Sequence, residues 1–100
     1  MNIHYRQGDL LFIKADSLGD SLREKHGQDI ITSNITGHSH SITRGKIYLA
    51  NPTWSDRANF YVIIPDEGAE VVHQEHRSIP LSGGIYKVIR QREVNGYVRD

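Results

Sequence analysis

The chain has 100 residues, of which 37% are hydrophobic, and this length suits one domain with a modest core spanning residues 1–100. Lysine and arginine together number twelve, as do aspartate and glutamate, so the net charge gives no argument for nucleic acid or an anionic membrane as partner. Cysteine is absent, which excludes disulfides, thiolate zinc ligands and thiol nucleophiles.

The N-terminal segment lacks the apolar core of a signal peptide. No stretch of the sequence approaches the roughly 20 apolar residues of a membrane span. We therefore expect a soluble, cytoplasmic protein with no membrane partner.

The first third of the chain predicts a strand followed by a short helix. Residues 10–13 form a continuous apolar run after the Gly8-Asp9 turn, which is typical of a strand buried on both faces. Residues 21–24 have the form of a capping box, and Gly27 suits a helix C-terminus. We therefore expect one short helix near residues 21–26.

The rest of the chain alternates between strand-forming segments and turns. The expected strands lie within residues 28–36, 38–42, 47–49, 60–64, 69–74 and 85–92. Turns are expected at residues 44–46 and 80–84, and the longest loop at 51–56. The Asn95-Gly96 pair indicates a hairpin at the C-terminal end.

These segments amount to about seven or eight short strands at the spacing of an all-β protein. An alternating strand–helix pattern, which would indicate a parallel sheet, is missing. The predicted fold class is thus all-β, a small barrel or sandwich with the one short helix near residues 21–26.

Four of the six histidines occur in two short clusters, His38-Ser39-His40 and His73-Gln74-Glu75-His76. Side chains two apart on a strand point to the same side, so His38 and His40 can act together. His73 can join them from a neighbouring strand. His76 can do so only if the strand ends or bulges near Gln74, because residues three apart face opposite sides of a regular strand.

This arrangement predicts a site for a divalent metal ion, namely zinc, iron or manganese, since imidazole suits all three. The expected ligands are His38, His40, His73 and His76. Glu75 and Glu70 are the candidate catalytic carboxylates, and the acidic segment 66–76, without lysine or arginine, favours a cation. If the protein is an enzyme, metal-assisted hydrolysis is the expected class, with one of these glutamates taking a proton from a metal-bound water.

Other interpretations of the histidines stay open. The two pairs can be unrelated surface residues near turns, or they can form a metal-free catalytic or ligand-binding cluster. A pattern without thiolates is less specific for zinc than a cysteine motif.

The His-x-His element invites comparison with cupins, which are small β-barrels whose first metal motif contains it. A cupin has a glutamate a few residues after the second histidine, whereas residues 41–44 here read Ser-Ile-Thr-Arg. The second cupin motif is not matched either. The similarity is therefore architectural, and the cupin ligand set does not transfer.

Four stretches together resemble a family of small uncharacterised bacterial and phage proteins. They are residues 6–11 (RQGDLL), 36–40 (TGHSH), 73–77 (HQEHR) and 86–93 (YKVIRQRE). The resemblance implies a stand-alone small domain in a bacterial cytoplasm or a phage, and it implies no particular activity.

Two further classes of function compete with the metal site. Arg90 and Arg92 lie on a basic C-terminal strand with tyrosines nearby, which can hold phosphates or stack bases in a nucleic-acid-binding module. Arginines on the solvent face of a strand also serve solubility and protect a sheet edge. The remaining alternative is a protein-binding module or a structural assembly protein, which can be a homo-oligomer.

Overall fold

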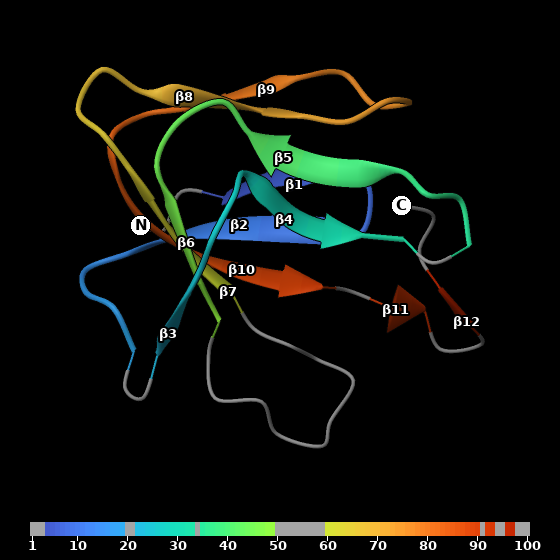
Figure 1. Cartoon of the computed structure of the whole chain (residues 1–100), viewed down its shortest axis with the longest axis horizontal. Coiled ribbons are helices and arrows are strands. Elements are labelled where there is room, and N and C mark those ends of the chain that lie inside the picture. The colour runs from blue at the N-terminus through green and yellow to red at the C-terminus, as the bar shows by residue number, and fades with distance from the viewer. Residues whose placement is uncertain are drawn as a thin grey trace.

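The computed structural model describes residues 4–19, 22–33, 35–49 and 60–90, and the short strands 92–93 and 96–97 (Figure 1). These residues form twelve strands. They are β1 (His4–Gln7), β2 (Leu10–Ala15), β3 (Arg23–Lys25), β4 (Asp29–Thr32), β5 (Ser39–Ile42), β6 (Lys46–Leu49), β7 (Phe60–Ile64), β8 (Ala69–Val72), β9 (Ile79–Leu81), β10 (Gly84–Arg90), β11 (Arg92–Glu93) and β12 (Gly96–Tyr97).

Two antiparallel sheets make up the body of the fold. The larger has the order β1-β2-β10-β7-β6-β3, and the smaller has the order β4-β5-β8-β9 and lies above it in Figure 1. The strands β11 and β12 form a separate pair. The all-β prediction is therefore confirmed in its sandwich form, and the expectation of a closed barrel is wrong because the two sheets stay separate.

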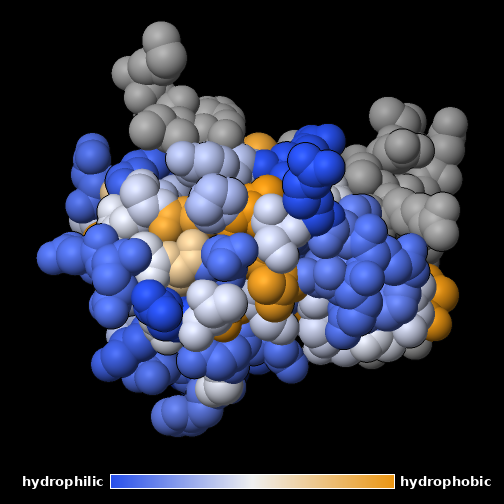
Figure 2. Space-filling model, turned by 90° about the horizontal axis from the view of Figure 1, so that it is seen from above, coloured by the Kyte–Doolittle hydropathy of each residue, from blue (hydrophilic) through white to orange (hydrophobic). Residues whose placement is uncertain are grey.

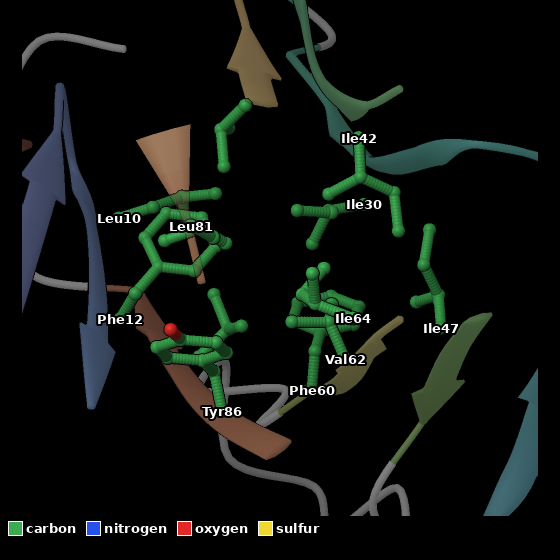
Figure 3. Close-up of a cluster of buried hydrophobic side chains, with 12 residues drawn as sticks. Leu10, Phe12, Ile30, Ile42, Ile47, Phe60, Val62, Ile64, Leu81 and Tyr86 are labelled. Carbon is green, nitrogen blue, oxygen red and sulfur yellow. The ribbon is translucent and has the colours of Figure 1, made fainter. Parts of the chain in front are cut away.

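The core lies between the two sheets and follows the two-residue alternation of the strands (Figure 3). The larger sheet contributes Leu10, Phe12, Ile47, Phe60, Val62, Ile64, Tyr86 and Val88, and the smaller sheet contributes Ile30, Ile42, Val71 and Leu81. The intervening residues of β2 and β7 are only half-buried. The expectation that residues 10–13 are buried on both faces is therefore wrong, since only one face of β2 meets the other sheet.

The predicted helix near residues 21–26 is also wrong, and no helix occurs in the part of the chain that the structure describes. Arg23–Lys25 instead forms β3, which pairs with β6 from Arg23↔Leu49 to Lys25↔Ile47. An isolated helix of one or two turns is marginal in water because its few hydrogen bonds do not offset the free-energy cost of nucleation. The β6 partner, brought in from far along the chain, supplies a ladder that local sequence does not reveal.

The turns follow the sequence prediction in most places. Gly8 has a φ of 58° in the two-residue β1–β2 turn, as the turns that match strand twist require. Pro80 was expected in a turn, yet it lies within β9, an edge strand, where a residue without an N–H is tolerated. The predicted C-terminal hairpin is confirmed by the pairing of Glu93 with Gly96. The expected loop at 51–56 lies outside the described residues.

The topology gathers four connections at one end of the sandwich, on the right in Figure 1. They are the β1–β2 turn, the segment between β4 and β5, the segment between β8 and β9, and the end of β10. The described residues include no helix long and apolar enough to cross a membrane.

Candidate functional site

The four clustered histidines come together at this end of the sandwich. The ring centroid of His73 lies 4.4 Å from that of His40, 4.6 Å from that of His76 and 5.4 Å from that of His38. The rings of His40 and His76 are 6.2 Å apart and stacked. Residues far apart in the sequence thus share one cluster, which is one of the arrangements that the sequence left open.

Strand pairing explains how the cluster forms. β5 and β8 run antiparallel with Ser41 opposite Val72, so continuing this register places His40 opposite His73. His40 points inward with Ile42, while His38 precedes β5 and is half-buried. β8 ends at Val72 and the chain bends, which returns His76 to the ring of His73.

Gln7, at the end of β1, determines that Nδ1 of the His40 ring carries a proton. Its amide nitrogen donates to the carbonyl oxygens of Val71, at 3.0 Å, and Arg77, at 2.9 Å. Its oxygen therefore faces His40 Nδ1, 2.9 Å away. An amide oxygen only accepts hydrogen bonds, so Nδ1 must carry a proton and donate it. This contact makes Nε2 the reactive nitrogen of His40.

Asp9 faces that reactive nitrogen from the β1–β2 turn. Its Oδ1 lies 3.3 Å from His40 Nε2, and both side chains are almost fully buried, at 3% and 2% exposed. Neither atom makes a hydrogen bond to any residue that the structure describes. A carboxylate oxygen and a nitrogen lone pair repel each other, so this gap requires a cation, either a proton or a metal ion.

Arg90, at the end of β10, neutralises the buried carboxylate from its other side, with Nε donating to Asp9 Oδ2 at 2.9 Å. Burial raises the pKa of Asp9, but the interactions with His40 and Arg90 outweigh it and hold the pKa below its ordinary value. Asp9 is therefore ionised at neutral pH, which makes it available as an oxygen ligand.

Glu75 lies on the side of the cluster nearer to solvent, whereas His73, which it contacts, is buried. The backbone N–H of Glu75 donates to His73 Nδ1 at 3.0 Å, so in the neutral ring Nε2 carries the proton. The Glu75 carboxylate lies 3.1 Å from His38 Nδ1. In this arrangement the described residues include no group of three histidines or carboxylates positioned to hold a metal ion. A metal ligand role for His73 requires rotation of its ring.

Glu70, the second expected catalytic carboxylate, lies elsewhere. It lines an open pocket of about 580 Å³ at the opposite end of β8, together with Asp66, Glu67 and Arg44. The acidic segment expected to surround the histidines therefore splits, and only Glu75 of its carboxylates contacts the cluster. Counting the charges along segment 66–76 gave the wrong surroundings for the histidines, because β8 places the carboxylates before it at one end and Glu75 at the other.

Arg90 contacts Asp9 within the site, and the side chain of Arg92 lies outside the described residues. The nucleic-acid interface through Arg90 and Arg92 stays a prediction.

Sequence reasoning missed Gln7 and Asp9 as site residues. One signal was available, because Gln7 pairs with Leu10, whose side chain is fully buried. A glutamine in register with a core-facing leucine occupies an inward position, where its amide needs partners. The Asp9–Arg90 contact, in contrast, joins residues 81 apart and leaves no local trace.

The fold and the site define an all-β, two-sheet protein with a buried polar network beneath a histidine cluster. Residues 6–91 match the model of a family described as Domain of unknown function (DUF8820), and the chain belongs to that family. The matched range contains every residue of the site. No curated protein and no solved structure matches the chain. A bacterial or phage origin stays a prediction.

Proposed function

We propose that this protein binds a divalent metal ion, zinc, iron or manganese, at the histidine cluster. The observation that carries the proposal is the contact between His40 Nε2 and Asp9 Oδ1. Its 3.3 Å length exceeds the roughly 2.7–2.9 Å of a charge-assisted hydrogen bond. Two ligand atoms each about 2.1 Å from a tetrahedral zinc ion lie about 3.4 Å apart, which matches the observed separation.

The tautomer of His40 supports the same proposal. A histidine that binds metal through Nε2 needs its Nδ1–H held by an acceptor, which orients the ring. Gln7 supplies this acceptor, and its own amide is held by two backbone carbonyls. Asp9 Oδ1 and His40 Nε2 thus form two prepared ligands.

The third ligand comes from His73, which would leave the fourth position of a tetrahedral ion to water, and His76 is the alternative third ligand. Imidazoles bound to one tetrahedral zinc ion have centroids about 5 Å apart, and the 4.4 Å between the rings of His40 and His73 is close to this value, whereas the rings of His40 and His76 are farther apart at 6.2 Å. Metal binding would require the His73 ring to rotate and to lose its hydrogen bond from the Glu75 N–H. His38 and Glu75 would lie at the open side, where a bound metal would supply Lewis-acid chemistry for hydrolysis and the Glu75 carboxylate would serve as the general base.

Metal analysis of protein purified without a histidine tag tests the proposal. The untagged chain should retain about one equivalent of metal after dialysis, and His40→Ala and Asp9→Asn should each lose it. His26→Ala is the matched control, because His26 is an exposed histidine between β3 and β4. Absence of bound zinc, iron and manganese, before and after incubation with each ion, together with unchanged melting in chelator, would contradict the proposal.

A proton in place of the metal defines the second candidate function. His40 would then be an imidazolium held between Gln7 and Asp9, and the cluster would act as a metal-free acid–base site. The same metal analysis separates the two, because only this second function predicts a folded protein that never takes up metal.

A further inference from the structure

Lys14 occupies an inward-facing position of the larger sheet. It follows Leu10 and Phe12 at the two-residue period of β2, and both of those side chains are buried in the core. Lys14 also pairs with Tyr86 of β10, so the two side chains lie on the same face of the sheet. A lysine at such a position needs polar partners for its ammonium group.

The partners of this ammonium group among the described residues are neutral. Lys14 Nζ donates to the carbonyl oxygen of Gly83 at 2.8 Å and lies 5.1 Å from the centroid of the Tyr86 ring. The absence of a side chain at Gly84 makes room for it, because a Cβ there would lie 2.7 Å from Nζ. The nitrogen is therefore held in place beside the turn between β9 and β10.

Ser82, in that turn, presents an exposed hydroxyl group to Lys14 and Tyr86. The Tyr86 hydroxyl donates its proton to the Ser82 carbonyl oxygen at 2.9 Å and lies 3.0 Å from Ser82 Oγ. Because a phenol has one proton, Ser82 Oγ donates to the Tyr86 oxygen and accepts from Lys14 Nζ at 3.4 Å. The turn thus holds a serine oxygen between a lysine nitrogen and a buried tyrosine hydroxyl.

Ser82 also lines the open pocket of about 580 Å³ that contains Glu70. The wall of this pocket combines charged residues with the apolar side chains of Ala69, Pro80 and Leu81. Seen from above, the neighbouring smaller sheet likewise exposes a few hydrophobic residues among hydrophilic ones (Figure 2). A small molecule with a polar and an apolar part can therefore reach Ser82 Oγ.

A serine beside a lysine is an arrangement of nucleophilic catalysis, because a neutral amine can take the hydroxyl proton as the oxygen attacks. The distance between such a nucleophile and its base is often long before a substrate binds. From this geometry we propose that Ser82 is a nucleophile for acyl transfer from small carboxylic esters, with Lys14 as its base. This site lies outside the histidine cluster and does not depend on the proposed metal binding.

The reaction has two steps. In the first, Ser82 Oγ bonds to the ester carbonyl carbon while the neutral amine of Lys14 takes its proton. The bond from that carbon to the alcohol oxygen breaks, and the leaving alkoxide takes the proton from Lys14. In the second, water attacks the acyl carbon and gives a proton to Lys14, which passes it to Oγ as the acyl bond breaks. The sum converts ester and water into carboxylic acid and alcohol.

A fluorophosphonate probe tests the nucleophile, since its phosphorus bonds to an activated serine oxygen and releases fluoride. The whole untagged chain is incubated with the probe in chelator, and mass spectrometry locates the label. We expect one label on Ser82 and none in Ser82→Ala, which keeps the backbone acceptors of Lys14 and Tyr86. Ser17→Ala removes an exposed serine after β2 and is the matched control, with labelling unchanged.

Variants of Lys14 test the base. Lys14→Met removes the amine, so the rates of labelling and of p-nitrophenyl acetate hydrolysis should each fall about 100-fold. Lys14→Arg keeps the charge, but a guanidinium group stays protonated, so both rates should fall to the same extent. It also serves as the test if the Lys14→Met chain does not fold. Lys46→Met, at an exposed position of β6, is the matched control and should leave both rates unchanged.

Two results would overturn the proposal. One is a chain whose Ser82 takes no label, or takes it no faster than its other serines. The other is a Lys14→Arg variant that is labelled as fast as the unchanged chain, because Lys14 then acts only through its charge. Since chelator is present throughout, neither result bears on metal binding at the histidine cluster.

Discussion

Gln7 accepts a hydrogen bond from His40 Nδ1 at 2.9 Å, and the two residues lie 33 positions apart on different sheets. The amide of Gln7 is held in turn by the carbonyl oxygens of Val71 and Arg77, which flank the segment that carries His73 and His76. One side chain therefore connects both halves of the cluster. It also decides which nitrogen of His40 is reactive.

Replacing Gln7 should release the His40 tautomer. In the unchanged chain, nitrogen NMR of metal-free protein should show His40 protonated at Nδ1. Gln7→Leu removes the acceptor of His40 and the donor that both backbone carbonyls share, so the free energy of unfolding should fall by about 3 kcal/mol. Those spectra should then show His40 without a fixed Nδ1–H. An unchanged His40 signal in a folded Gln7→Leu variant would contradict the assignment.

His40 should matter for stability even without metal. His40→Ala leaves Gln7 and Asp9 buried with fewer partners, so the free energy of unfolding should fall by about 2–3 kcal/mol. His26→Ala, at an exposed position, should change it by less than about 0.5 kcal/mol. Urea titration of both variants in chelator measures the difference. Similar losses in the two variants would show that the buried network contributes little.

The lowered pKa of Asp9 gives a prediction for acid conditions. Because the folded pKa of Asp9 lies below its ordinary value of 3.8, ionised Asp9 stabilises the folded chain at neutral pH, and this contribution is lost as the pH falls through the folded pKa. The stability gap between the unchanged chain and Asp9→Asn should therefore be largest above pH ~4 and should narrow in stronger acid. Melting temperatures of metal-free protein over this range measure it, and a gap independent of pH would refute the linkage.

Gly45 should be intolerant of any side chain. Its φ is +118°, and a Cβ there would overlap the carbonyl oxygen of Ile63. Gly45→Ala should lower the free energy of unfolding by about 3 kcal/mol, through backbone strain and the clash together. Gly27→Ala is the control, because Gly27 also has a positive φ, +96°, but has open space around its Cβ position. Its cost should be about 1 kcal/mol, measured by the same urea titration.

The strands were predictable where the alternation of apolar and polar residues repeats the geometry of the backbone. β7 and β10 follow this rule, and their inward residues Phe60, Val62, Tyr86 and Val88 are buried. The strand at residues 23–25 could not be predicted, because its local signals favour a helix while its partner, β6, comes from later in the chain. Local propensity is a weak guide when a long-range ladder is available.

The candidate site divides in the same way. The two histidine pairs were visible as a pattern, and the condition for His76, that β8 must end before it, is met by the bend after Val72. Glu70 shows the limit of the pattern, because it is close to the histidines in sequence and lies in a different pocket.

By itself, the sequence determined the all-β class, the positions of most turns and the histidines that a site would use, because side-chain periodicity and glycine chemistry act over a few residues. Only the tertiary structure decided that Asp9 and Arg90 form an ion pair, that Gln7 sets the His40 tautomer and that the sheets stay open. These contacts depend on the order and register of strands. Burial of the whole core selects these pairings, and no single stretch of sequence is enough to determine them.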